Sequence, residues 1–108
     1  MRVLVFLLVA IGCGSGGPVE IRYEVTGTAR SVDVTYTNEA GDTEQLTGRQ
    51  LPWEHTFTGS RGQFVYVSAQ NEGEAGTVTA RVYVGGDEFR SSTSEGGYVI
   101  AEASGRAQ

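Results

Sequence analysis

The sequence predicts an all-β domain, a sandwich or barrel of about 7–8 short antiparallel strands. Three observations indicate it. Apolar and polar residues alternate along most of the chain, turn residues recur roughly every 8–12 positions, and no segment shows the 3.6-residue period of a helix. The chain of 108 residues has 16 glycines and only two prolines, which is typical of many tight turns. Because no helix separates the strands, a parallel βαβ arrangement is not expected.

Four strands are expected in the first half of the chain. The first covers residues 19–26, with the odd-numbered residues pointing to one face, and the second covers 32–37. A polar turn at 38–42 leads to a weaker strand at 43–49, whose main apolar residue is Leu46. Pro52 indicates a strand start or an edge position. After it, Trp53, His55 and Phe57 alternate with polar residues.

The second half predicts four more strands. Residues 64–70 are apolar on both faces, which favours a central strand. Residues 77–84 alternate, and Gly85-Gly86 predicts a hairpin turn to a strand at 87–94. A last strand is expected at 98–103, and residues 104–108 are expected to fray.

Residues 1–12 are expected to be a lipoprotein signal peptide. Arg2 precedes an apolar run from Val3 to Ile11, which is far shorter than the ~20 residues of a membrane-spanning helix but suits a signal peptide. Ala10-Ile11-Gly12-Cys13 resembles a bacterial lipobox, although the usual pattern has Leu where this chain has Ala10. The resemblance implies that Cys13 carries a diacylglyceryl group, whose acyl chains (palmitate, for example) hold the membrane. Residues 13–18 would then be a flexible Gly/Ser linker.

The alternative for the amino terminus is an ordinary cleaved signal peptide with an incidental cysteine. Cys13 is the only cysteine, so it cannot form an internal disulfide. Its position directly after the apolar run favours lipidation.

The charge excludes some classes of partner. Of the eight Arg and Lys residues only Arg2 precedes Cys13, so the rest of the chain, with 13 acidic residues, has a net charge of −6. Nucleic-acid binding needs clustered cations, and so does a polybasic membrane patch. We therefore expect neither.

No constellation for catalysis is found. His55 is the only histidine, and no nucleophile or orienting carboxylate can be assigned to it. One histidine also excludes the usual structural zinc sites. The acidic turns at 38–42, 72–74 and 86–88 could hold calcium, but solvated acidic loops are the commoner explanation. We expect no enzyme, no metal and no cofactor.

Three aromatic residues are candidates for binding. Trp53 either fills the core beneath Pro52, which we favour, or is exposed and stacks on a ligand or partner. Tyr66 and Tyr98 leave the same two alternatives open.

Five segments carry a family resemblance. The most distinctive are Leu51-Pro52-Trp53 and the Val-Ser-Ala-Gln run at 67–70, and the others are Tyr23–Ala29, Val32–Tyr36 and Val78–Val84. In order and spacing, over roughly residues 20–106, they resemble the MmpS family of transport accessory proteins, which work with MmpL transporters of the resistance-nodulation-division (RND) class. The resemblance implies an immunoglobulin-like β-sandwich at 19–106, outside the cytoplasmic membrane. It also implies a role in helping a transporter export lipids or siderophores.

Two departures from the family pattern are visible. Mycobacterial members usually hold the membrane with an N-terminal transmembrane helix, where this chain has a lipobox. Many members have a cysteine pair at the positions of Ala80 and Ala103.

The sequence thus leaves two functions open. One is an accessory subunit of an RND-type transporter. The other is a stand-alone envelope lipoprotein that binds a ligand or protein. In either case we expect the lipid anchor in the cell membrane or an outer membrane, with the domain facing the periplasm or the exterior.

Overall fold

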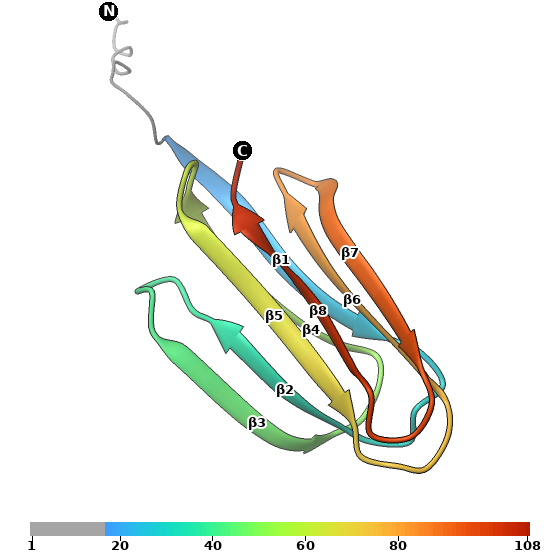
Figure 1. Cartoon of the computed structure of the whole chain (residues 1–108). Helices are drawn as coiled ribbons and strands as arrows, with labels where there is room; N and C mark the ends of the chain where they lie inside the picture. Colours follow the sequence, from blue (N-terminus) through green and yellow to red (C-terminus); the bar gives the residue numbers. More distant parts are fainter. Residues whose placement is uncertain (1–16) are drawn as a thin grey trace, which may run out of the picture.

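The computed structural model describes residues 17–108, which form eight strands and no helix. The predicted signal peptide at 1–12, Cys13 and most of the predicted linker at 13–18 lie outside the described residues. The all-β prediction is confirmed (Figure 1). The strands are β1 Pro18–Thr26, β2 Val32–Thr37, β3 Thr43–Arg49, β4 Trp53–Ser60, β5 Phe64–Asn71, β6 Thr77–Val84, β7 Asp87–Glu95 and β8 Ile100–Arg106.

The strands make two four-stranded antiparallel sheets packed face to face. One sheet has the order β4-β1-β6-β7 and is called here the β1 sheet; the other, β3-β2-β5-β8, is called the β5 sheet. Every strand pair is antiparallel. The segment at 64–70, predicted to be central, lies between β2 and β8. The fold is therefore the expected β-sandwich.

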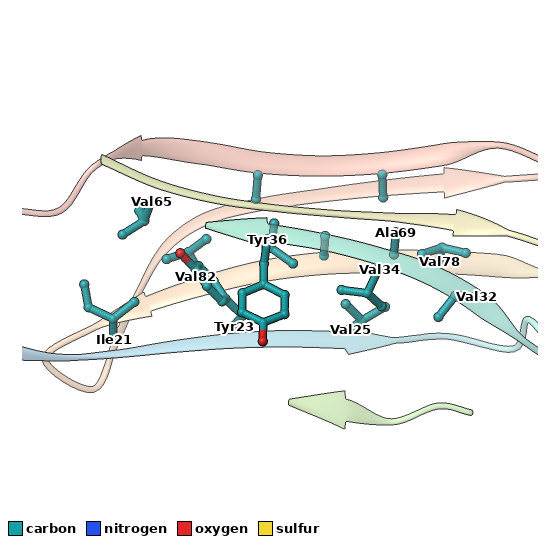
Figure 2. Packing of buried hydrophobic residues seen from close by; sticks show 14 of the residues in the cluster. Ile21, Tyr23, Val25, Val32, Val34, Tyr36, Val65, Ala69, Val78 and Val82 are labelled. Carbon is teal, nitrogen blue, oxygen red and sulfur yellow. The ribbon is translucent and has the colours of Figure 1, made fainter. Parts of the chain in front are cut away.

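The core lies between the sheets and is built mainly from β-branched residues. Alternation along β1 and β6 buries every second side chain, as the period-two pattern predicted. Figure 2 shows these side chains meeting between the two layers. Burying each valine or isoleucine stabilises the fold by about 1.5–3 kcal/mol before entropy is counted. The largest fully buried side chains are Tyr23, Ile21, Val25, Val32, Val34, Val65, Val67, Val78, Val82 and Asn71.

Two predictions at the carboxyl end are wrong. Tyr98 does not begin the last strand, which starts at Ile100. Residues 104–108 do not fray as a unit, because β8 continues to Arg106 and Ala107 is fully buried. The backbone N–H of Ala107 donates a 2.8 Å hydrogen bond to the carbonyl of Gln63, so the β4–β5 turn fastens the end of the chain.

The first residue of β1 and the carboxyl terminus lie at the same end of the sandwich (Figure 1). The β4–β5 and β6–β7 turns lie there too. The loops that follow β1, β5 and β7 gather at the opposite end, which we call the distal end. Any tether that enters at Pro18 therefore lies a whole strand length from these loops.

Candidate functional site

The three predicted binding residues lie on three different parts of the molecule. Trp53 points into the sandwich from β4, an edge strand, and is partly buried. Tyr66 lies on the outer face of β5, because its neighbours Val65 and Val67 point inward. Tyr98 lies in the loop between β7 and β8. The structure does not bring these residues together, so each location is described by itself.

Trp53 belongs to an aromatic cluster between the sheets. Its ring centroid lies 5.5 Å from that of Tyr36 and 6.4 Å from that of His55. Tyr23 and Phe57 continue the cluster into the core, with centroids 5.6 Å apart. Tilted aromatic pairs at these separations add about 0.5–1.5 kcal/mol each beyond their buried area. Trp53 thus packs at the border of the core.

His55 lies within this cluster and has one ring nitrogen without a hydrogen-bond partner. Its ring centroid is 4.9 Å from that of Tyr36 and 5.7 Å from that of Phe57. Its Nε2 atom is shielded from solvent and has no hydrogen-bond partner among residues 17–108. A buried polar atom without a partner costs about 1–3 kcal/mol.

Tyr66 and Phe64 form an aromatic pair on the outer face of the β5 sheet. Their ring centroids are 6.4 Å apart, and the Phe64 side chain is 47% exposed. Their partners on β8 are Ser104 and Arg106. This pair lies at the end of the sandwich near the chain termini.

The outer face of the β1 sheet is laced with ion pairs instead. Arg22 pairs with Glu24 and Glu54, and Arg81 pairs with Glu24 and Glu88, all at 3.4–3.5 Å. The Arg22 guanidinium also lies 3.9 Å from the Tyr83 ring centroid. Such surface pairs contribute about 0–1 kcal/mol each. The arginine and glutamate charges at the centre of this face therefore neutralise one another.

The distal end is organised by one buried side chain, Asn71, which is fully buried at the end of β5. Its Nδ2 donates to the carbonyls of Ala75 and Gly96, both at 2.9 Å, and its Oδ1 accepts from the N–H of Gly73 at 2.8 Å. One amide therefore ties the β5–β6 loop to the β7–β8 loop. A backbone hydrogen bond from Glu72 to the carbonyl of Ser31 adds the β1–β2 loop. We call residues 27–31, 72–76 and 96–99 the distal loop cluster.

Tyr98 is displayed by this cluster in a strained conformation. Its φ of 62° is the only positive value among the non-glycine residues at 17–108, and a bulky residue rarely adopts it. Backbone contacts hold it there: its N–H donates to Gly73, and its carbonyl accepts from Gln70 Nε2 at 3.0 Å. The ring is nevertheless 56% exposed. Strain of this kind costs about 1–3 kcal/mol and tends to occur at functional positions.

A shallow cavity of about 440 Å³ lies beside Tyr98. It is lined by Arg30, Glu72, Gly73, Glu74, Ala75 and Tyr98. A hydrogen bond with the Asp33 carboxyl raises the pKa of Glu72, since the bond needs one of the two acids to keep its proton. Within residues 17–108, no three His, Cys, Asp or Glu side chains come together as a metal site. The cavity therefore offers an aromatic ring, a cation and carboxylates to a partner surface.

Sequence reasoning selected Tyr98 but missed Asn71 and Arg30. An asparagine directly after a strand and before a Gly-rich loop was the available signal for Asn71. Arg30 had no local signal, because the topology alone brings the β1–β2 loop beside residues 72–75.

The comparison with family models decides the identity. Residues 14–100 match the model of a family described as "Mycobacterium membrane protein", which is the MmpS type. The chain belongs to the MmpS family. A search of the curated proteins found no match. This MmpS chain shows no membrane-spanning helix within residues 17–108. Family membership associates it with a membrane.

Proposed function

We propose that this MmpS protein is a non-catalytic envelope lipoprotein, anchored by Cys13, that assists an RND-type transporter in exporting a lipid or siderophore. The observation that carries the proposal is the family match over residues 14–100. The aromatic and loop sites described above supply packing and surface contacts, which is what an accessory subunit needs.

The layout of the domain supports a docking role for the distal end. The end at which the chain enters β1 and the distal loop cluster lie at opposite ends of the strands (Figure 1). A subunit tethered at Pro18 can present its distal loops to a neighbour in the same membrane while its own anchor stays free of the contact.

Tyr98 is the residue in this cluster best suited to anchor a partner. Its ring is 56% exposed, and the bonds around Asn71 hold the surrounding loops before any partner arrives. Tyrosine is enriched among residues that dominate interface energies, and a preorganised loop loses little entropy on binding. Arg30 beside it adds the cation that a partner carboxylate would pair with.

The test is co-purification of RND-type transporter subunits with the full chain from its native membrane, using wild type, Tyr98→Asn and Phe64→Asn. Asparagine tolerates positive φ, so Tyr98→Asn removes the ring without adding strain. Phe64→Asn is the matched control, because it removes an exposed aromatic at the other end of the sandwich. We expect Tyr98→Asn to lower recovery at least about tenfold, the equivalent of ~1.4 kcal/mol, and Phe64→Asn to leave it unchanged.

Two results would oppose the proposal. Equal recovery with Tyr98→Asn would move the docking surface away from the distal loops. Failure of the wild-type chain to retain any transporter subunit would favour the alternative function, a stand-alone binding lipoprotein of the envelope.

A further inference from the structure

Each sheet of the sandwich has two edge strands, and three of the four edges are blocked. β3 carries a bulge where its register with β2 shifts between Val32 and Val34. Gly48 in this bulge has a φ of 64°, and its N–H is taken by Asp33 Oδ1 at 3.0 Å. Bulges of this kind twist an edge and prevent another strand from pairing with it.

β7 and β8 are edge strands on the same side of the sandwich, and their side chains contact each other there. The register of β7 shifts between Val82 and Tyr83 on its neighbour, and Arg90 Nη1 donates to the carbonyl of Phe89. Ser94 on β7 donates to the carbonyl of Ile100 on β8 at 2.8 Å. Gly105 on β8 is so close to the Phe89 ring that an added Cβ would lie 3.1 Å from it. The edges of β7 and β8 are thus partly occupied by each other's side chains.

β4 is different from the other three. It pairs with β1 through eight consecutive residue pairs, from Pro18↔Ser60 to Val25↔Trp53, with no register shift. It contains one charged residue, Glu54, and no proline. Among residues 17–108, the backbone groups of 53–59 form no hydrogen bond other than those to β1. A long, regularly paired and nearly uncharged edge is the kind that pairs with another strand.

The side chains of β4 show a second sign of a missing neighbour. His55 Nε2 is buried without a partner, and it lies on this same strand. Trp53 and His55 are both only partly buried, although they point to the inner side of the sheet. A further strand beside β4 would cover these two rings and extend the core over them.

We propose that β4 accepts an extended strand from a different envelope protein, so that the β1 sheet gains a fifth strand. The inference rests on the proposed accessory function, because it requires a partner protein. It places that contact on β4, which is separate from the distal loop cluster. The partner segment has alternating apolar and hydroxyl side chains, with the apolar ones over Trp53 and His55. It is neutral or basic, since the chain after Cys13 has a net charge of −6.

A second copy of this chain fits the edge less well. Antiparallel pairing of β4 with itself would place the two Pro18 residues at opposite ends of a strand about 30 Å long. Residues 13–18 span at most about 20 Å. If the strands stand perpendicular to the membrane, the Pro18 of one copy would lie too far from the surface for its tether to reach it. Parallel self-pairing would set Glu54 beside Glu54, and two domains of net charge −6 repel each other.

The experiment compares amide hydrogen exchange of the full chain in its native membrane with that of the purified chain in detergent. Strand addition should slow exchange at alternate amides of β4 by at least about tenfold in the membrane, and leave β3 unchanged. A Thr56→Lys/Thr58→Lys variant carries two exposed lysines on the β4 edge, and should lose that protection. Thr43→Lys/Thr47→Lys on the exposed positions of β3 is the matched control and should keep it.

A photo-crosslinking residue at Thr56 identifies the occupant. An adduct with another polypeptide, lost in the presence of Thr58→Lys, supports the proposal, whereas an adduct between two copies of this chain overturns it. Equal exchange of β4 in membrane and detergent overturns it as well. These outcomes separate the two proposals. If a transporter co-purifies but β4 is unprotected, only the accessory function is retained. If β4 is protected and crosslinks to a protein other than a transporter, only the edge site is retained.

Discussion

The hydroxyl of Tyr23 donates a 2.6 Å hydrogen bond to the carbonyl of Thr37, and so joins the β1 sheet to the β5 sheet through the core. The same oxygen accepts the N–H of Tyr66 at 3.3 Å. A buried phenol that satisfies two backbone groups of the opposite sheet fixes how the two layers sit on each other. This contact is polar, whereas the rest of the core is held mainly by apolar packing.

Tyr23→Phe should destabilise the fold by about 1–3 kcal/mol at neutral pH, because it leaves the Thr37 carbonyl and the Tyr66 N–H without this partner. Chemical denaturation monitored by circular dichroism measures it. Tyr83→Phe is the control, since the Tyr83 hydroxyl bonds Glu24 on the partly exposed outer face. Equal losses in the two variants would contradict a special role for the buried hydroxyl.

The same variant should alter the response to alkali. Burial raises the pKa of Tyr23 from 10.0 to about 12, because the phenolate is poorly solvated in the core. The folded pKa lies above the unfolded one, so this stability is complete below pH 10 and is lost as the pH rises from 10 to 12. The loss amounts to roughly 3 kcal/mol, and Tyr23→Phe should flatten this part of the curve. An alkaline slope identical to that of wild type would refute the assignment.

Asn71→Ala should cost about 2–4 kcal/mol and loosen the distal loop cluster, because the three side-chain hydrogen bonds that hold its loops to Asn71 are lost at once. Urea unfolding gives the energy, and proteolysis at residues 72–76 and 96–99 reports the loosening. Gln70→Ala, which removes a single bond to Tyr98, should cost less than about 1 kcal/mol. If both variants unfold at the same urea concentration, Asn71 is not the organising residue.

A disulfide should form spontaneously in an Ala80→Cys/Ala103→Cys variant expressed in an oxidising compartment. Ala80 on β6 and Ala103 on β8 are both buried and belong to opposite sheets, so a bridge between them would cross the core. The bridge would stabilise the fold by roughly 3 kcal/mol in the chain-entropy model. Thiol titration and mass spectrometry of the purified variant provide the measurement. Ala80→Cys/Ala101→Cys is the control: preferential closure of that pair would mean that the family alignment is two residues out of register on β8.

Cys13→Ser should release the protein from the membrane, because a diacylglyceryl group with two acyl chains gives stable anchoring and the variant has none. Detergent phase partitioning of the full chain measures this, and mass spectrometry of the wild-type amino terminus shows the added acyl mass. Ser15→Ala, in the same linker, should still partition into detergent. A Cys13→Ser protein that remains in the detergent phase would exclude lipidation as the anchor.

The strands could be predicted from sequence because their information is local. The alternation in β1 and β6 identified the inward-facing residues, and Gly85-Gly86 identified a hairpin in which both residues have positive φ. The central position of β5 in its sheet was predicted from a different observation, namely that this strand is apolar on both faces.

The errors concern residues whose environment comes from distant parts of the chain. Tyr98 continues an apolar pattern, but its φ is set by bonds to Gly73 and Gln70, more than 20 residues away in sequence. Residues 104–107 carry little apolar surface. They are ordered by pairing with residues 64–66 of β5 and by the hydrogen bonds of Ala107 to Gly62 and Gln63. The distal loop cluster depends on Asn71 in the same way, so its architecture was not accessible from local pattern.

The strand that follows the proposed tether, β1, lies inside its sheet and is hydrogen-bonded on both sides, to β4 and β6. A mechanical load between the anchor and the distal loops would run along this strand, so both ladders would be sheared together and their bonds would have to yield collectively. A strand at the border could be peeled away one bond at a time. A domain held by a lipid at one end and by a partner at the other would therefore resist the pull through both ladders of β1 at once.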